Sequence, residues 1–288
     1  MRRWLATALA TVVAVTGCAD TTSTGPAPDG SGSGAPASAS GAGRPVVLPP
    51  TNGSFDYQIG GAYEPDVGVT IVERDHSGVP SGAAYNICYV NAFQTQPEAA
   101  AWWKAEHRDL LLKAADGSYV EDPEWPGEIL LDTTTPARRT AIAGVVQGWM
   151  DECAAKGFRA VEPDNLDSWT RSGDRLTHDH NMALARLLVE HAHDAGLAVA
   201  QKNTPELAPY GRDQIGFDFA VVEECQHHDE CQSYTDAYGD HLIEIEYTDN
   251  PVGAYLRACA TRGARISVIL RDRDVAPLGR QGYHYERC

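Results

Sequence analysis

The sequence lacks the short motifs that mark nucleotide-binding proteins and thiolate metal sites. No Gly-x-Gly-x-x-Gly follows the first predicted strand and no Gly-x4-Gly-Lys-Ser/Thr occurs, which argues against nucleotide-binding folds. No Cys-x-x-Cys pair occurs either. The loop from Cys225 to Cys231, which contains His227 and His228, is only a weak zinc signal. We therefore expect no cofactor and no metal ion.

Basic residues are scarce. The chain has 23 lysines and arginines against 40 aspartates and glutamates, a formal net charge of −17. Loss of Arg2 and Arg3 with a cleaved leader would leave 21 basic residues against the same 40 acidic ones. Nucleic-acid binding needs clustered Lys and Arg, so no nucleic-acid partner is expected. An acidic surface attracts cationic ligands, although acidity can also serve solubility alone.

The apolar run near the N-terminus, Trp4–Val15, is too short to span a bilayer as a permanent helix. It follows two arginines and leads into the tetrapeptide VTGC, which resembles the bacterial lipobox. We therefore expect residues 1–18 to be a lipoprotein signal peptide, cleaved before Cys18, whose thiol is then lipidated. The alternative is ordinary secretory cleavage near Ala19. Both interpretations place the mature protein outside the cytoplasm, and the first anchors it to the outer face of the cell membrane.

Bulky apolar residues are almost absent from residues 19–50, which are rich in Gly, Ser, Ala, Thr and Pro. Such a segment buries too little surface to offset the entropy of ordering, so it is predicted to be a flexible linker. Residues 51–288 contain no second low-complexity break and are numerous enough for one large domain. We expect a single domain that acts as a monomer.

Six cysteines remain after Cys18, an even number that suggests three disulfides in an oxidising compartment. Six cysteines allow 15 pairings, and the sequence alone does not choose among them. A short loop favours Cys225–Cys231, and Cys259–Cys288 would hold the C-terminus. Those two pairs leave Cys88–Cys153.

Short apolar runs alternate with helical patterns in the way that is typical of βα units. Amphipathic stretches at Arg138–Lys156, Thr177–Ala195 and Gly253–Thr261 each precede a glycine and then a strand. Nine strands are predicted, at Phe55–Ile59, Val69–Val72, Ala84–Val90, Ile129–Leu131, Ala160–Glu162, Ala198–Gln201, Phe219–Glu223, Leu242–Glu246 and Ile266–Leu270.

Polar residues gather where these strands end, as in Glu162-Pro163-Asp164-Asn165, Lys202-Asn203, Glu223-Glu224, Glu246-Tyr247 and Arg271-Asp272. Polar groups from several strands at one rim are typical of a TIM-barrel active site. The predicted fold is therefore α/β, a (β/α)8 TIM barrel. Since a barrel needs eight strands, either Val69–Val72 or Ile129–Leu131 is expected to be an extra element or a wrong assignment.

Two acidic segments carry the strongest chemical signal. One strand leads directly into Glu162, Asp164 and Asp167, three carboxylates within six residues. A second strand leads into Glu223-Glu224-Cys225. Because neighbouring strand residues point to opposite sides, only one of Glu223 and Glu224 is expected to face the barrel mouth. The alternatives are an exposed acidic turn and a solvated loop.

With Gly196–Asn203, Trp125–Glu128, Leu131-Asp132 and Glu244–Tyr247, these segments resemble glycoside hydrolase family 114, the endo-α-1,4-polygalactosaminidase-like TIM barrels. The resemblance runs from about Phe55 to Asp274, and it is weakest at the first two strands. It implies hydrolysis of α-1,4-linked galactosamine polymers, with Asp164 and Glu223 as the catalytic pair. Such a pair combines a proton donor for the leaving oxygen with a second carboxylate at the anomeric carbon. We assign Asp164 as nucleophile or charge stabiliser and Glu223 as general acid.

Other polar and aromatic residues are expected to bind the sugar by their positions at the strand ends. They are Tyr57, Tyr89, Asp132, Glu162, Asn165, Asp167, Lys202, Asn203, Glu224, Glu246 and Tyr247. Trp125 and Trp169 are further candidates for stacking on sugar rings, although aromatic residues are more often core. Lys202 has the alternative role of neutralising Glu162 or Asp164. The expected partner is a cationic amino-sugar polymer, which suits the acidic charge.

Two other functions remain open at this point. The same fold could act on another exopolysaccharide, or the protein could bind surface carbohydrate without cleaving it. A metal-dependent deacetylase is disfavoured, because no paired histidines with a nearby aspartate have suitable spacing.

Overall fold

The computed structural model describes residues 45–82 and 84–288. The predicted signal peptide, Cys18 and most of the 19–50 linker lie outside the described residues. The last part of the predicted linker contacts the domain, since the Tyr85 hydroxyl donates to the Val47 carbonyl at 2.6 Å. None of the helices in the described part of the chain is both long and apolar enough to cross a membrane.

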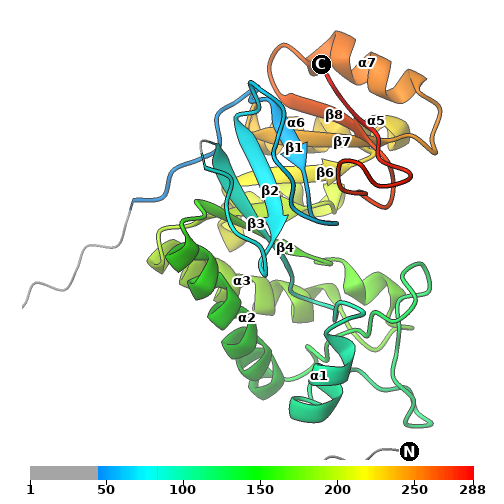
Figure 1. Ribbon diagram of the computed structural model, residues 1–288. Helices are drawn as coiled ribbons and strands as arrows, with labels where there is room; N and C mark the ends of the chain where they lie inside the picture. Colours follow the sequence, from blue (N-terminus) through cyan, green and yellow to red (C-terminus); the bar gives the residue numbers. More distant parts are fainter. Residues whose placement is uncertain (1–44, 83) are drawn as a thin grey trace, which may run out of the picture. The chain divides into compact units, whose positions relative to one another are not determined.

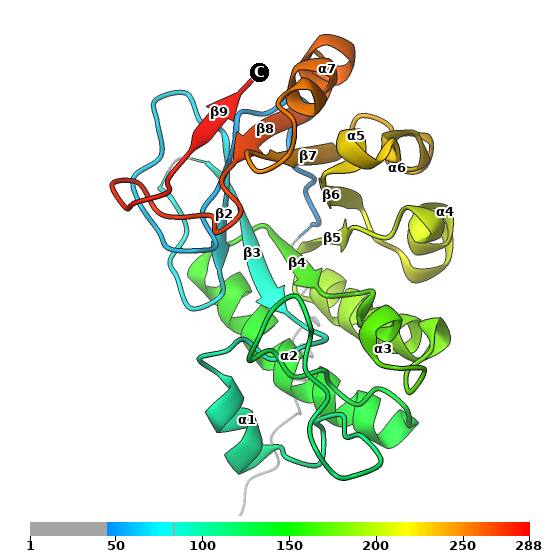
Figure 2. The same ribbon diagram turned by 90° about the vertical axis from the view of Figure 1, so that its right-hand side faces the viewer.

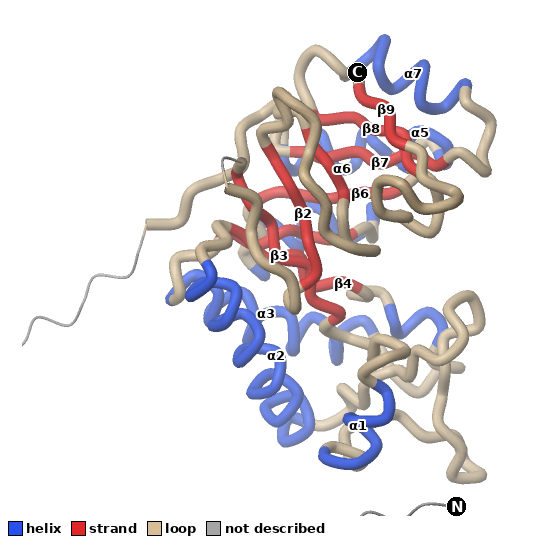
Figure 3. The backbone as a smooth tube through the Cα atoms, viewed as in Figure 1, coloured by secondary structure: helices blue, strands red, loops and turns tan. Residues whose placement is uncertain are grey.

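Within the described ranges, nine strands form one sheet in sequence order, and the first eight are parallel (Figures 1 and 3). This sheet curls into a nearly closed (β/α)8 barrel, which confirms the predicted fold class. The strands are β1 (Phe55–Tyr57), β2 (Ile71–Asp75), β3 (Tyr85–Asn91), β4 (Ala160–Asp164), β5 (Ala198–Lys202), β6 (Phe219–Glu223), β7 (Leu242–Tyr247), β8 (Ser267–Arg271) and β9 (Tyr285–Arg287).

The antiparallel strand β9 lies at the seam of the barrel. It pairs with β8, and its Tyr285 hydroxyl donates to the Phe55 carbonyl of β1 at 2.7 Å. From β8, the Ser267 hydroxyl also reaches across the seam, to the Gly53 carbonyl at 2.6 Å. The C-terminal strand therefore joins the last barrel strand to the first.

Helices follow strands β3 to β7, whereas the described residues between β1 and β2, between β2 and β3 and after β8 form no helix. Figure 2 shows several of them arranged in a fan outside β4 to β8. The helices are α1 (Ala100–Glu106), α2 (Pro136–Lys156), α3 (His178–Asp194), α4 (Ala208–Tyr210), α5 (Cys225–His228), α6 (Cys231–Tyr238) and α7 (Gly253–Arg262). Short helical turns occur at η1 (Ser168–Arg171), η2 (Pro205–Leu207) and η3 (Gly211–Ile215).

Local sequence explains the ends of the two longest helices. The Thr135 side chain accepts from the Arg138 N–H at the start of α2, and α2 ends at Gly157 with φ of 102°. At the start of α3, Thr177 and His180 form a reciprocal capping box. The three helices predicted from periodicity are present as α2, α3 and α7, and each of their ends lies within two residues of the prediction.

Two apolar layers flank the sheet. One fills the barrel and consists largely of Phe55, Ile71, Ile87, Ala160, Ala198, Ala200, Phe219, Val221, Ile243, Ile245 and Ile269. The other, larger layer lies between the strands and the helices. Because strand side chains alternate, the polar residues that end the inward-facing rows must point into the barrel mouth.

Two strand predictions need correction. Ile129–Leu131 is not a barrel strand: it makes isolated antiparallel bridges with Gln94, Leu111 and Glu121 in the long β3–β4 connection. The predicted strand at Val69–Val72 is real but lies two residues later, as β2. The short C-terminal β9 was not predicted, because its three residues carry no alternating apolar pattern.

The described residues contain three disulfides. They join Cys88 to Cys153, Cys225 to Cys231 and Cys259 to Cys288, the pairs favoured from loop length and position. The first ties β3 to α2, the second closes the turn after β6, and the third ties α7 to the C-terminus.

Candidate active site

A cleft of about 730 Å³ opens at the carboxyl ends of the barrel strands. Its lining includes 11 carboxylate side chains against three from Lys and Arg. Of the predicted site residues, it includes Tyr57, Tyr89, Asp164, Asn165, Asp167, Lys202, Asn203, Glu223, Glu224 and Tyr247. The strand ends therefore build one strongly acidic cavity at the barrel mouth.

The Lys202 ammonium, at the end of β5, lies at the centre of the cavity floor. Its Nζ is 2.9 Å from Glu162 Oε1, 3.3 Å from Asp164 Oδ1 and 3.6 Å from Glu223 Oε2. The Lys202 side chain is 3% exposed, so it needs these partners to remain charged. Burial lowers the pKa of Lys202, but Asp164, Glu162 and Glu223 outweigh burial and raise this pKa well above its ordinary value.

Asp164 ends β4 and is held in its ionised form. The Tyr89 hydroxyl donates to Oδ2 at 2.7 Å, and the Asn165 N–H donates to Oδ1 at 2.7 Å. Burial acts to raise the pKa of Asp164, but the Lys202 ammonium and these two hydrogen bonds lower it below its ordinary value. A carboxylate that stays ionised in a cavity can stabilise or attack a developing positive carbon.

Glu223 ends β6 and faces Asp164 across Lys202. Its two oxygens accept from the Asn203 amide, at 3.0 Å, and from the Tyr247 hydroxyl. Its backbone N–H donates to Asn203 Oδ1 at 2.9 Å, so Asn203 fixes both the main chain and the side chain of this residue. The carboxyl group is thereby oriented toward the cavity from two neighbouring strands.

Asp164 and Glu223 are close enough to act on one linkage. Asp164 Oδ1 and Glu223 Oε2 lie 3.3 and 3.6 Å from the same nitrogen. These two oxygens are therefore at most about 7 Å apart, a distance within the range of paired glycosidase carboxylates.

Glu162 lies beneath the cavity, fully buried, and does not line it. Burial raises the pKa of Glu162 to about 7, although Lys202 opposes this rise. Glu162 therefore supports the cavity floor through its contact with Lys202. This role takes the place of the contact with the sugar that its position in the sequence predicted.

The chain leaves strands β4, β5 and β6 through residues with positive φ, namely Asn165 (64°), Asn203 (48°), Thr204 (64°) and Glu224 (61°). Non-glycine residues in this region are uncommon and concentrate at functional sites. The turn at Glu224 also explains why both Glu223 and Glu224 line the cleft. The strand alternation that predicted only one of them ends at Glu223.

At the rim, Glu224 is paired with Arg273, which follows β8. Arg273 Nη2 lies 2.7 Å from Glu224 Oε1, and its guanidinium carbon lies 4.1 Å from the centre of the Tyr247 ring. The Arg273 guanidinium therefore packs on the tyrosine whose hydroxyl donates to Glu223.

On the opposite side, Arg171 holds the loop after β4. It contacts Asp122 at 2.5 Å, Asp167 at 2.9 Å and Asn165 Oδ1 at 2.8 Å. Glu128 lines the same part of the cleft, and burial raises its pKa to about 7.

Besides Glu162, three predicted residues do not reach the cleft. Asp132 is paired with Arg138 at 2.8 Å, next to the start of α2. Glu246 points away from the barrel interior, because Tyr247 takes the inward position, and it accepts from the Gln226 N–H. Trp169 packs against the apolar layer under the helices, whereas Trp125 lines the cleft and is 48% exposed.

Several residues of the site and of its support were missed, among them Glu73, Glu128, Arg171 and Arg273. Arg273 stands three residues beyond the end of the predicted strand Ile266–Leu270, so its position carried a usable signal. Glu73 could be recognised only once the register of β2 was known, since it lies inside the barrel.

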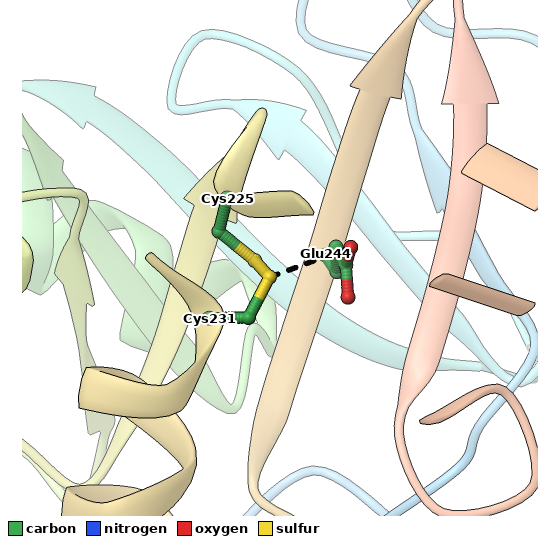
Figure 4. A group of neighbouring side chains, drawn as sticks. All are labelled: Cys225, Cys231 and Glu244. Atoms are coloured by element: carbon green, nitrogen blue, oxygen red, sulfur yellow. Dashed lines mark hydrogen bonds between the residues drawn. A yellow bond between two sulfur atoms is a disulfide. The ribbon is translucent and has the colours of Figure 1, made fainter. Parts of the chain in front are cut away.

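The loop from Cys225 to Cys231, which gave a weak zinc signal in the sequence, is closed by a disulfide. Cys225 and Cys231 are bonded to each other beside Glu244, and Cys231 Sγ lies 3.7 Å from Glu244 Oε1 (Figure 4). Glu244 is paired with Arg262 at 2.9 Å. Sulfurs bonded to each other offer no thiolate to a metal ion.

The chain matches the sequence model of glycoside-hydrolase family GH114 over residues 35–288. Its fold is similar to that of Ega3 from Aspergillus fumigatus, solved in complex with galactosamine, at 20% identity and a TM-score of 0.66, covering 86% of this chain and 100% of that one. The glycoside hydrolase domain of PelA from Pseudomonas aeruginosa is also similar, at 15% identity and a TM-score of 0.53, covering 80% and 98%. No curated protein matched the sequence.

Proposed function

The chain belongs to glycoside-hydrolase family GH114, and from this premise we propose that it is an endo-glycosidase that cleaves α-1,4-linked galactosamine polymers with Asp164 and Glu223. The observation that carries the proposal is the convergence of these two carboxylates on Lys202 in the mouth of the barrel. The galactosamine bound by the structurally similar Ega3 supports the choice of sugar.

In this mechanism Asp164 is the nucleophile or charge stabiliser. Lys202, Tyr89 and the Asn165 N–H keep it ionised, so its charge is available to the anomeric carbon. Glu223 is the general acid and gives its proton to the leaving glycosidic oxygen. Asn203 and Tyr247 hold the Glu223 carboxyl in the orientation that this transfer needs.

The acidic cleft supports a cationic polymer as substrate. Glu98, Glu124 and Glu206 line it without an ion-pair partner among the described residues. Free amines of galactosamine are cationic below about pH 8, so each sugar ring would bring a positive charge to this surface.

The test is incubation of the purified domain with three polymers: de-N-acetylated galactosaminogalactan, its fully N-acetylated form and a neutral glucan. We expect reducing ends to appear with the de-N-acetylated polymer, and oligosaccharides to accumulate before monosaccharide. Preferential release from the N-acetylated or neutral polymer would replace the proposed substrate by another exopolysaccharide. Binding without release from any polymer would favour a carbohydrate-binding role.

We also propose that the mature enzyme is tethered to the outer face of the cell membrane through lipidated Cys18 and the 19–50 linker. Expression in a bacterial host should yield enzyme in the membrane fraction, and Cys18→Ser should release it or leave the leader uncleaved. Full release of the wild-type protein into the medium would favour ordinary secretory cleavage near Ala19.

A further inference from the structure

Glu73, in the middle of β2, is a buried carboxyl group to which the mechanism above assigns no role. It is 0% exposed and faces the barrel interior between Tyr57 of β1 and Ile87 of β3. Neither of its carboxyl oxygens has a hydrogen-bond partner among residues 45–82 and 84–288. An ionised carboxylate in such surroundings is very costly, so Glu73 must either carry a proton or share one.

Glu162 offers the matching acceptor. Its Oε1 lies 2.9 Å from the Lys202 Nζ, but its Oε2 is buried and likewise has no partner in the described part of the chain. Two ionised carboxylates cannot hydrogen-bond each other, whereas a carboxyl and a carboxylate form a short, strong bond. One proton on Glu73 therefore provides a hydrogen bond that pairs one oxygen of Glu73 with Oε2 of Glu162. Burial, the charge of Glu162 and the contact between the two side chains all raise the pKa of Glu73 well above its ordinary value.

The groups that face Glu73 from the other strands leave Glu162 as its acceptor. They are Tyr57 of β1, Glu162 and Asp164 of β4 and Lys202 of β5. Tyr89 of β3, Glu223 of β6 and Tyr247 of β7 are the other titratable groups around Lys202. Asp164 and Glu223 already accept hydrogen bonds from tyrosines and amides in the cavity. Lys202 is a donor, and it is in contact with Glu162.

We propose that Glu73 is a positioning residue that stays protonated in the folded enzyme and donates a hydrogen bond to Glu162, so that Glu162 remains ionised and keeps Lys202 centred between Asp164 and Glu223. Glu73 does not line the cleft, so it acts through Glu162 and Lys202 and not on the sugar. The consequence for catalysis rests on the proposed function, whereas the protonation of Glu73 does not.

The kinetic test compares Glu73→Leu and Glu73→Gln on de-N-acetylated galactosaminogalactan. Leu removes the donor, so Glu162 takes up a proton more readily. We expect the acid limb of kcat/KM to move up by about one pH unit and kcat to fall about tenfold, with KM nearly unchanged. Gln supplies an amide donor and should restore the wild-type acid limb.

Glu244→Leu is the matched control, because Glu244 is a buried glutamate outside the cleft whose pKa burial also raises. It should lower thermal stability without moving the acid limb.

A second measurement does not depend on activity. In protein labelled with ¹³C at glutamate carboxyls, the signal lost in Glu73→Gln should be that of a protonated carboxyl at neutral pH. An ordinary titration of that signal below about pH 5 would overturn the proposal. So would a Glu73→Gln enzyme that behaves like Glu73→Leu, or a folded Glu73→Leu enzyme with an unmoved acid limb. If the wild type cleaves no polymer, the proposed function fails while the carboxyl signal still decides the state of Glu73.

Discussion

At the residue scale, one ammonium group balances several carboxylates inside the barrel mouth. Lys202 contacts Glu162, Asp164 and Glu223 within 3.6 Å, and its side chain is 3% exposed. Water cannot replace this charge in a buried site, so the ionisation of Asp164 depends on Lys202.

We predict that Lys202→Met lowers kcat/KM by at least about 100-fold, the scale of losing a preorganised charged group. The acid limb of the residual activity should move to higher pH, because the pKa of Asp164 is no longer lowered by the ammonium. Folding should be checked by circular dichroism, because leaving one partner of a buried pair alone costs about 3–5 kcal/mol. A folded variant with an unmoved acid limb would contradict this role of Lys202.

At the element scale, the helices and most strands were predictable, and their exceptions have physical causes. The Ile129–Leu131 run is as apolar as a barrel strand, yet its neighbours are segments of the long β3–β4 connection. Periodicity reports burial and not the identity of the partner, so it cannot separate these cases. The two acidic segments located Asp164 and Glu223 because both end strands, where side chains meet at one rim.

The residues that support Asp164 and Glu223 were less predictable from the sequence. Glu73 and Glu162 face each other only because of the register in which β2, β3 and β4 pair. Glu224 reaches the cleft through a backbone turn with φ of 61°, which no strand pattern encodes. Inter-strand register and the backbone conformation of turns therefore limit what the sequence predicts about this site.

Removal of two of the disulfides should affect the free energy of unfolding and the activity in opposite order. Cys88–Cys153 spans 65 residues and Cys225–Cys231 spans six. In the chain-entropy account, replacing the first pair by alanines should cost about 4 kcal/mol and replacing the second about 2 kcal/mol. Activity should respond in the opposite order, because Cys225–Cys231 lies directly after Glu223 and Glu224. Urea unfolding and polymer cleavage measure the two effects, and the same order in both assays would contradict the prediction.

At the scale of the whole molecule, the excess of negative charge determines how the binding of a cationic substrate depends on salt. The cleft has 11 carboxylates in its lining, and the chain has a net charge of −17. Salt shortens the screening length from about 10 Å at 0.1 M to about 3 Å at 1 M. We therefore expect KM for the cationic polymer to rise steeply with NaCl while kcat changes little. The double variant Glu98→Gln, Glu124→Gln should weaken this dependence, and Glu106→Gln, Glu152→Gln on helices α1 and α2, whose residues do not line the cleft, should not. A KM independent of salt would argue against an electrostatic role for the cleft.

Stability should fall as pH rises from about 4.5 to 7. Burial raises the pKa of Glu128 and Glu246 from 4.5 to about 7, so the folded state binds more protons than the unfolded state in this window. Asp164 and Glu224 have lowered pKa values, and their stabilisation is lost only as pH falls below their unfolded values of 3.8 and 4.5. Calorimetry should show a higher Tm at pH 5 than at pH 8, and Glu246→Gln should reduce the difference. A Tm that rises between pH 5 and pH 8 would contradict the buried, protonated carboxyls.

The most direct test of the account is reducing-end release from de-N-acetylated galactosaminogalactan by Asp164→Asn and Glu223→Gln, measured with the affinity of each variant for the polymer. We expect each to lose at least about 1,000-fold in turnover while binding is retained, since the side chains keep their size and lose only their chemistry. Glu224→Gln, which alters the neighbouring carboxylate paired with Arg273, should retain most of the activity. Wild-type turnover by either Asp164→Asn or Glu223→Gln would contradict the central claim that these two carboxylates act together on one sugar linkage.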